Sequence, residues 1–291
     1  MKRIAESELI LNADGSVYHL NLLPEDVAGT VITVGDPERV TQVSRYFDRI
    51  ELEKSKREFV THTGILRGKR ITVISTGIGT DNIDIVLNEL DALVNVDLET
   101  RLPKEQLKKL NIIRIGTSGT IQADINVDSL LVSGMAFGLD TLMHYYKHQT
   151  TTDEKHLLQA LRSALPKEST LSLYIASADR QLIDSLAHDL PQGIAITAPG
   201  FYAPQGREIR ARAANPDFMD IIQQFDFHGQ RITNLEMETA GIYGLAAALG
   251  HRAISFNVIL ANRVTQIFSK QPELIMDKYI QQLLSRLTNI L

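Results

Sequence analysis

The chain has 291 residues, 44% of them hydrophobic and 22% charged, which is the composition of a globular protein and not of a disordered or fibrous one. The net charge of −5 and the scattered basic residues exclude the broad positive face of a nucleic-acid-binding protein. The absence of cysteine excludes disulfides, thiolate metal sites and cysteine nucleophiles. We expect a single α/β domain over residues 1–291.

The start of the chain shows no targeting signal. Met1–Leu11 alternates charged and apolar residues and lacks the apolar core of a signal peptide. No apolar run approaches the roughly 20 residues needed to cross a bilayer. We therefore expect a cytoplasmic protein without membrane or nucleic-acid partners, in which residues 1–17 form an N-terminal extension.

Between residues 30 and 109, β-branched apolar runs precede one amphipathic stretch. Strands are predicted at Thr30–Val34, Val60–Leu66 and Arg70–Ser75. The last two flank a turn at 67–69 and are expected to pair as an antiparallel hairpin. From Ile83 to Val94, apolar residues recur every three to four positions, which predicts a helix capped by Thr80 or Asp81. The charged segment 97–109 is predicted to be an exposed excursion.

From residue 110 onwards the alternation of strands and helices continues. Strands are predicted at Ile112–Ile115, Ser129–Ser133, Leu171–Ala176, Ile194–Thr197 and Arg252–Leu260. Helices are predicted around His156–Leu165, over Glu238–Leu249 with a stop at Gly250, and from Pro272 with Leu291 on its apolar face. This order of elements is typical of a mainly parallel sheet covered by helices.

Glycine, hydroxyl and guanidinium groups follow three of the predicted strands, in the segments Gly35–Arg39, Gly77–Thr80 and Arg114–Gly119. Ligands of such sheets gather beyond the carboxyl ends of the strands. Glycines let backbone N–H groups approach an anion, and arginine matches phosphate oxygens in a bidentate way. A single segment would be explained by a strand-to-helix turn with a solvated arginine. Three converging segments favour a phosphate site.

The sequence lacks the complete motifs of several other kinds of binding or catalytic site. Gly77–Gly79 lacks the third glycine of a dinucleotide fingerprint, and no P-loop lysine follows any glycine run. Gly116–Thr120 lacks the final glycine of a nucleophile elbow. The eight histidines show no zinc-protease spacing, so we expect no metal.

A second cluster is Asn234–Glu238, in which Glu236 and Glu238 flank Met237. In a strand the two carboxylates would point the same way, and carboxylates are strong acceptors for vicinal sugar hydroxyls. The alternative is that Glu238 is an acid at the start of a helix, favoured there by the helix dipole.

A third cluster is the loop Phe201–Arg207, which follows a predicted strand. The amide of Gln205 offers both a donor and an acceptor to the edge of a planar base, and the ring of Phe201 can stack on the base or the sugar. The alternative is a surface loop with Phe201 tucked into the core.

At these residues the chain resembles the nucleoside phosphorylase family, which includes uridine phosphorylases and hexameric purine nucleoside phosphorylases. The resemblance runs through most of the chain, and its anchors are Val34–Val40, Lys56–Phe59, Ser75–Gly79, Arg114–Gly119 and Glu236–Ala240. It implies a single-domain three-layer αβα fold with a central mixed, partly barrel-like sheet flanked by helices. It also implies a homo-oligomer, a dimer at least and a hexamer in many bacterial members, with each active site shared between two subunits.

The resemblance implies a role for individual residues. Phosphate binding is implied for Gly35, Arg39, Arg114 and Thr117, with Arg57 from a neighbouring subunit. Ribose binding is implied for Glu236, Met237 and Glu238, with His19 crossing the interface to the 5′ hydroxyl. Base binding is implied for Thr117, Gly119, Phe201, Gln205 and Arg207, and the catalytic set is Arg114, Gln205, Arg207 and Arg263. Inorganic phosphate is the co-substrate, and no cofactor is expected.

The implied reaction is phosphorolysis of uridine and related pyrimidine nucleosides to the free base and ribose 1-phosphate, in nucleoside salvage. The uridine enzymes pair a Gln-x-Arg, here Gln205–Arg207, with a late arginine, here Arg263. Purine enzymes carry an aspartate near Asn262, and this chain has none between Arg252 and Thr265. The alternatives are a purine phosphorylase, a nucleosidase on the same fold, and a non-catalytic nucleoside-sensing protein.

The chain departs from the family pattern at Thr80–Asn82, where many relatives have glycine-proline-serine. Asp81 could repel phosphate unless it points away as a helix cap. Because some bacterial relatives bind a monovalent cation near the position of Glu58, the departure is a further reason to expect no metal.

Overall fold

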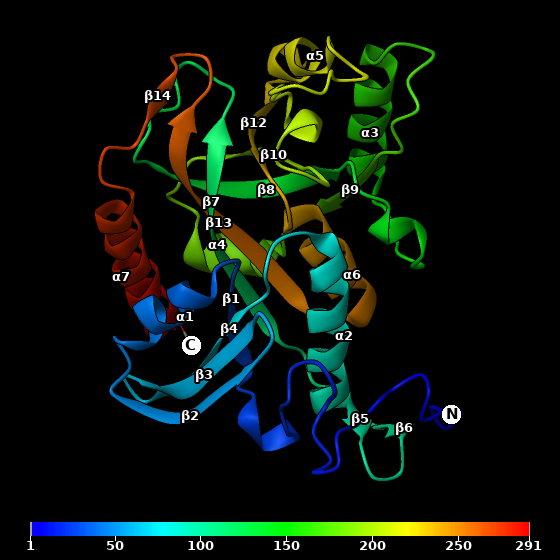
Figure 1. The fold of residues 1–291 in the computed structure, drawn as a ribbon, viewed down its shortest axis with the longest axis vertical. Helices are drawn as coiled ribbons and strands as arrows, with labels where there is room; N and C mark the ends of the chain where they lie inside the picture. Colours follow the sequence, from blue (N-terminus) through cyan, green and yellow to red (C-terminus); the bar gives the residue numbers. More distant parts are fainter. Residues whose placement is uncertain (1, 291) are drawn as a thin grey trace.

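The computed structural model describes residues 2–290, so Leu291 of the predicted last helix lies outside the described residues. One sheet of twelve strands crosses the molecule (Figure 1). Its order is β11 (Asp226–Phe227), β12 (Gln230–Glu236), β10 (Gln192–Thr197), β8 (Leu130–Gly138), β13 (Arg252–Asn262), β7 (Asn111–Thr120), β1 (Thr30–Val34), β4 (Lys69–Ser75), β3 (Phe59–Leu66) and β2 (Arg49–Lys56). β14 (Ile267–Phe268) adds to β13, and β9 (Tyr174–Ser177) adds to β8.

One half of this sheet closes on itself. β12 pairs with β10 and also, antiparallel, with β7, so that β12, β10, β8, β13 and β7 form a small barrel. The other half stays open, with β1 parallel to both β7 and β4. Because β13 is parallel to β7 but antiparallel to β8, the sheet is mixed. The expected α/β fold with a mixed, partly barrel-like sheet is confirmed.

Helices cover the sheet on both sides and each side has its own core (Figure 1). α2 (Thr80–Asn95) and α6 (Thr239–Leu249) pack together on one side. α1 (Pro37–Ser44), α4 (Arg180–Leu186) and α7 (Pro272–Ile290) cover the other side. α3 (Thr152–Ala164) and α5 (Phe218–Gln224) cover the outer strands of the barrel. Short 3-10 turns lie at Pro24–Asp26, Leu142–His144 and Ala203–Gln205.

The structure corrects the predicted end of β7. The segment Gly116–Gly119 was expected to follow the strand, but β7 continues through it to Thr120 and stays paired with β13, with one register shift between Ile259 and Ala261. A Cβ atom at Gly116 would lie 2.1 Å from Nη1 of Arg114, so the glycine leaves room for that guanidinium to lie along its own strand. The glycines therefore shape the strand and do not end it. β8 likewise runs on past Ser133 to Gly138.

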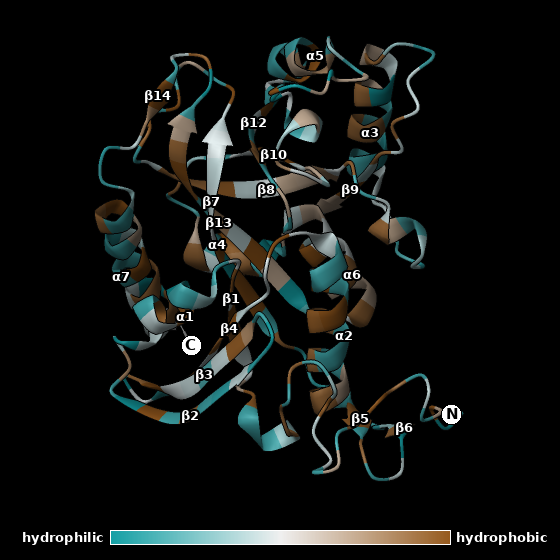
Figure 2. Ribbon diagram, in the orientation of Figure 1, coloured by the Kyte–Doolittle hydropathy of each residue, from teal (hydrophilic) through white to brown (hydrophobic). Residues whose placement is uncertain are grey.

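Several elements were missed or misplaced. β2 was not predicted, because its charged sequence suits an exposed sheet edge and is largely hydrophilic in Figure 2. The short helices α1, α4 and α5 were also missed. α3 begins earlier than predicted, at Thr152, because Thr151 and Glu154 form a capping box. The predicted cap of α2 is wrong, since Gly79 holds the N-cap position and no side chain among residues 2–290 makes a cap hydrogen bond there.

The predicted hairpin is confirmed. β3 and β4 pair antiparallel, and Arg67 and Gly68 both have positive φ, as a two-residue hairpin turn requires. Within the segment 97–109, residues 105–109 are exposed and Leu102–Pro103 (β6) pairs with Val96–Asp97 (β5). None of the helices described between residues 2 and 290 is long and apolar enough to cross a membrane.

Candidate active site

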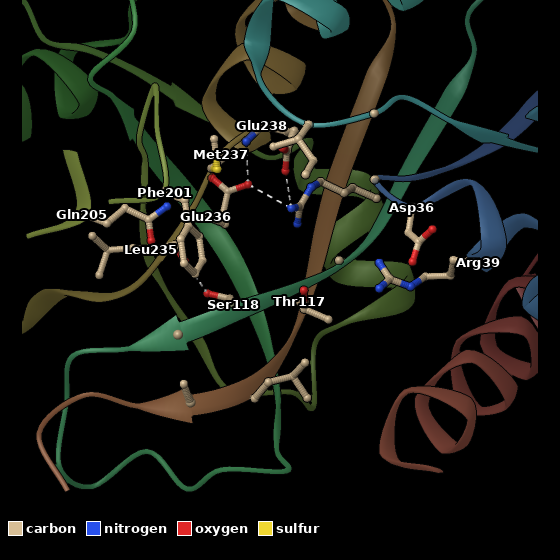
Figure 3. Close-up of a pocket in the computed structure, with 18 of the residues that line it drawn as sticks. Asp36, Arg39, Thr117, Ser118, Phe201, Gln205, Leu235, Glu236, Met237 and Glu238 are labelled. Atoms are coloured by element: carbon tan, nitrogen blue, oxygen red, sulfur yellow. Dashed lines mark hydrogen bonds and ion pairs between the residues drawn. The ribbon is translucent and has the colours of Figure 1, made fainter. Parts of the chain in front are cut away.

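A cavity of about 710 Å³ lies where the carboxyl ends of β1, β4 and β12 meet the glycine-containing half of β7. It brings together most of the residues that the sequence singled out (Figure 3). Asp36 and Arg39 lie at one end, Gln205 and Phe201 at the other, and Glu236 and Glu238 between them. The remaining predicted residues that line it are Gly35, Arg114, Thr117, Gly119, Arg207 and Met237.

The first end of the cavity holds the guanidinium group of Arg39 beside the carboxylate of Asp36. Asp36 caps α1 by accepting a hydrogen bond from the N–H of Glu38 at 2.9 Å, and so places Arg39 in the first turn of that helix. Burial lowers the pKa of Arg39; the charge of Asp36 opposes this shift, and the charge of Arg114 adds to it. Within residues 2–290, the buried Nε of Arg39 has no hydrogen-bond partner. Arg39, together with the neighbouring Arg114 in the centre of the cavity, offers two guanidinium groups, which suit an oxyanion.

The centre of the cavity is a buried cluster of one guanidinium and two carboxylates. Nη2 of Arg114 donates to Oε2 of Glu238 at 2.6 Å and lies 3.2 Å from Oε2 of Glu236. Nη1 of Arg114 donates to Oδ1 of Asn257 at 2.8 Å. Burial disfavours the charged form of Arg114, but Glu236 and Glu238 outweigh it and raise its pKa. Burial raises the pKa of Glu238, and the charge of Arg114 limits that rise.

The two carboxylates do not lie in one strand, so the first interpretation of this cluster is wrong, and the alternative that Glu238 is an acid at the start of a helix is confirmed. β12 ends at Glu236, and Glu238 holds the N-cap position of α6 without a side-chain cap bond. Glu236 satisfies the start of this helix instead: its Oε2 accepts from the N–H groups of Glu238 at 2.9 Å and Thr239 at 2.8 Å. Glu238 accepts from the N–H of Gly79 at 2.9 Å. The residue that caps α6 is therefore Glu236.

The other end of the cavity is made by the loop that follows β10. Gly206 has a left-handed backbone, with φ of 67°, and turns the chain so that Arg207 faces back over the loop. Nη1 of Arg207 donates to Oε1 of Gln205 and to the carbonyl of Phe201, both at 2.7 Å. Its guanidinium lies 3.9 Å from the centre of the Phe201 ring. Phe201 is 52% exposed, so the alternative that it packs in the core is wrong.

Arg263 does not line the cavity. Its guanidinium donates to the carbonyl of Gln205 and, at 3.2 Å, to that of Gly206, on the far side of the loop. Burial lowers the pKa of Arg207, and the nearby charge of Arg263 lowers it further. Arg263 thus acts on the cavity through the loop that it holds.

His19 and Arg57 do not line the cavity of their own chain either. They lie in one cluster with Tyr18, whose ring is 4.9 Å from the His19 ring and 5.8 Å from the Arg57 guanidinium. Nδ1 of His19 lies 2.6 Å from Oε1 of Glu89. Arg57 is exposed in the turn between β2 and β3, with φ of 57°. Their expected reach into a neighbouring subunit stays a prediction.

Sequence reasoning missed several residues that line the cavity: Asp36, Pro37, Glu58, Ile78, Asn82, Ser118, Leu235, Leu260, Ala261 and Phe268. Asp36 and Ser118 lie inside the motifs already singled out and could have been found there. No sequence pattern indicated Phe268 as a cavity residue, because it reaches the cavity only through the pairing of β14 with β13. Asp81 is exposed and does not line the cavity, although Asn82 does. No group of His, Asp and Glu able to hold a metal occurs among the described residues.

Comparisons with known proteins agree with this geometry. The model of the phosphorylase superfamily matches residues 30–288. A uridine phosphorylase of Thermococcus kodakarensis is 31% identical over 275 residues, which cover 94% of this chain and 87% of the relative. A DeoD-type purine nucleoside phosphorylase of Hahella chejuensis is 26% identical, over 81% of this chain and 83% of the relative.

A solved structure shows the same relationship. The Trypanosoma brucei nucleoside phosphorylase, described as showing uridine phosphorylase activity, superposes with a TM-score of 0.88 at 28% identity. The match covers 97% of this chain and 99% of that one. The chain therefore belongs to the phosphorylase superfamily.

Proposed function

We propose that this chain is an enzyme that cleaves uridine, and related pyrimidine nucleosides, with inorganic phosphate to give the free base and ribose 1-phosphate. The observation that carries the proposal is the order of groups along one cavity: Arg39 and Arg114, then Glu236 to Glu238, then Gln205 and Arg207. This order matches phosphate, sugar and base. The relatives from Thermococcus kodakarensis and Trypanosoma brucei support the same reaction.

Phosphate is assigned to Gly35, Arg39, Arg114 and Thr117 as the co-substrate, with no cofactor or metal. Because the two carboxylates of Glu236 and Glu238 outnumber the single guanidinium of Arg114, a phosphate dianion needs further cations. We assign this role to Arg57 of a second copy of the chain, and the 5′ hydroxyl to His19 of that copy. Both residues lie outside the chain's own cavity and within one surface cluster. This placement favours a homo-oligomer, which we propose to be at least a dimer and, as a larger assembly of such dimers, a hexamer.

The mechanism follows from where charge develops. A phosphate oxygen attacks C1′ of the ribose as the bond from C1′ to the base nitrogen breaks, and the bonding electron pair leaves with the base. Gln205 and Arg207 donate hydrogen bonds to the departing base and stabilise its negative charge, while Arg263 holds their loop. Glu236 to Glu238 hold the sugar over the phosphate, so positioning supplies much of the catalysis.

The region near Asn262 supports a pyrimidine over a purine substrate. The side chain of Asn262 is buried, donates to the carbonyls of Gln122 and Ile125, and accepts from the N–H of Val264. It therefore anchors a loop and does not line the cavity, and no aspartate lies between Arg252 and Thr265 to protonate a purine. Arg39 and Arg114, assigned to phosphate, argue against a nucleosidase, which attacks with water. We assign the reaction to nucleoside salvage in the cytoplasm.

An assay with uridine, deoxyuridine, thymidine and inosine, each with and without phosphate, tests the proposal. We expect uracil to be released from uridine only when phosphate is present. Faster cleavage of inosine than of uridine would identify a purine enzyme, and release without phosphate would identify a nucleosidase. Calorimetric binding of uridine without any cleavage would identify a sensor.

A further inference from the structure

Strand β13 presents two buried polar side chains to Arg114. In the pairing of β13 with β7, Ser255 lies opposite Arg114, and Asn257 lies opposite Gly116. Side chains two positions apart in a strand share one face, and Gly116 has no side chain, so the guanidinium of Arg114 lies over Gly116 and reaches Asn257. Its Nη1 donates to Oδ1 of Asn257 at 2.8 Å and to Oγ of Ser255 at 3.3 Å. Both β13 residues are fully buried, and neither lines the cavity.

The orientation of the Asn257 amide is fixed by its neighbours. Its Nδ2 donates to Oγ of Ser133 at 3.0 Å and to Oγ of Ser255 at 3.3 Å. A flipped amide would turn Nδ2 towards the N–H donors of Arg114, and two donors cannot bond each other. Oδ1 of Asn257 therefore faces Nη1 of Arg114. The hydroxyl of Ser255 is held in turn by the hydroxyl of Thr239, 2.9 Å away.

The two Nη nitrogens of Arg114 are held in different ways. Nη2 lies 2.6 Å from the carboxylate of Glu238 and 3.2 Å from that of Glu236. Nη1 instead donates to a neutral amide and a neutral hydroxyl. Among residues 2–290, Nε of Arg114 has no hydrogen-bond partner, so its N–H is the donor that remains for a ligand in the cavity that Arg114 lines. Neutral acceptors fix the guanidinium without cancelling more of its charge, as a third carboxylate would.

We propose that Asn257, supported by Ser255, is a positioning residue for the phosphate end of the cavity. It fixes Nη1 of Arg114, and because the guanidinium is planar, this also fixes the direction of the Nε–H. Arg114 then meets the phosphate with a donor already in place and with its charge kept. The inference rests on the proposed function, because the anion that Arg114 serves is the phosphate of that reaction.

Replacement of Asn257 by leucine tests this role, because leucine has a similar volume and no hydrogen-bond acceptor. In the phosphorolysis of uridine, we expect Asn257→Leu to raise KM for phosphate about threefold to tenfold, the size of one hydrogen bond. KM for uridine and kcat at saturating phosphate should stay nearly unchanged, because Gln205 and Arg207 at the base end lie outside this network. Equal losses for phosphate and uridine would make Asn257 a general support of the fold and would overturn the proposal.

A double-mutant cycle shows whether Asn257 acts through Arg114. Arg114→Lys keeps a positive charge but has no Nη1 for Asn257 to hold. Calorimetry with inorganic phosphate should therefore show a loss of affinity for Arg114→Lys and no further loss when Asn257→Leu is added. Losses that add up would show that Asn257 acts on phosphate by another route and would contradict the proposal.

Two further variants keep the test decisive if Asn257→Leu does not fold. Ser255→Ala removes an acceptor of both Nη1 and the Asn257 amide, and should weaken phosphate binding about twofold to fivefold. Thr33→Val is the matched control. Thr33 lies opposite Arg114 on the other neighbouring strand, β1, and its buried hydroxyl has no hydrogen-bond partner among residues 2–290, so this variant should bind phosphate normally. Equal phosphate affinity of Ser255→Ala and Thr33→Val would refute the positioning role.

Direct binding separates failure of this inference from failure of the proposed function, because calorimetry with phosphate needs no nucleoside. If Asn257→Leu lost affinity for phosphate but the wild-type chain cleaved no uridine, only the proposed function would fail. If the wild-type chain cleaved uridine with phosphate and Asn257→Leu bound phosphate as tightly, only the positioning role would fail. A wild-type chain that bound no phosphate would refute both.

Discussion

Replacement of Arg114 tests whether this residue supports the fold as well as the proposed phosphate site. Arg114 is buried between Glu236 and Glu238, and also donates to Asn257. In Arg114→Met the side chain keeps much of its volume but loses its charge, so two buried carboxylates remain without a counter-ion. Breaking a buried ion pair in this way costs about 3–5 kcal/mol of unfolding free energy.

The loss can be measured as a change in melting temperature. A loss of about 1 kcal/mol in unfolding free energy lowers the melting temperature of a chain of 150–250 residues by roughly 2–4 °C. Arg114→Met should therefore melt roughly 6–20 °C below the wild type. Adding Glu238→Gln removes one of the unpaired carboxylates, so the double variant should melt well above the single one. An arginine that only bound phosphate would leave the melting temperature of the phosphate-free enzyme unchanged. That result, or no recovery in the double variant, would refute the reasoning.

The other predictions concern the base loop, a helix cap and a surface ion pair. Arg207→Ala should lower kcat on uridine roughly 100- to 1,000-fold, because the guanidinium meets charge that develops only in the transition state, whereas Arg263→Met should lower kcat less. Thr151→Ala should lower the unfolding free energy by about 1 kcal/mol, measured in urea, through loss of the α3 cap. Arg286 lowers the pKa of Asp189 to about 2, so this pair stabilises the fold above pH 3.8, Asp189's ordinary value, and loses that effect as the pH falls towards 2. Asp189→Asn should therefore melt slightly below the wild type at pH 5, and the gap should narrow as the pH falls from 3.8 towards 2.

Most of the residues that line the cavity could be predicted from the polar motifs, because each motif lies beside a strand that the pattern of apolar residues also predicts. Gly35 and Arg39 follow the run of β1, and Gln205 and Arg207 follow that of β10. Strand ends in such a sheet meet at one edge, so residues far apart in the chain come together there. The position of Arg263 could not be predicted in this way. Its guanidinium donates to the backbone carbonyls of Gln205 and Gly206, and so it lies on the far side of that loop from the cavity.

By itself, the sequence determined the elements whose signals are local: the hairpin turn at Arg67 and Gly68, the end of α6 at Gly250, and the glycine and arginine motifs beside the strands. Only the tertiary structure decided that β12 closes the barrel against β7, and that Glu236 and Glu238 share Arg114. The physical reason is that a turn or a cap depends on a few neighbouring residues. A pairing between strands or between buried charges depends instead on burial and register between segments more than 100 residues apart, which local preferences do not specify.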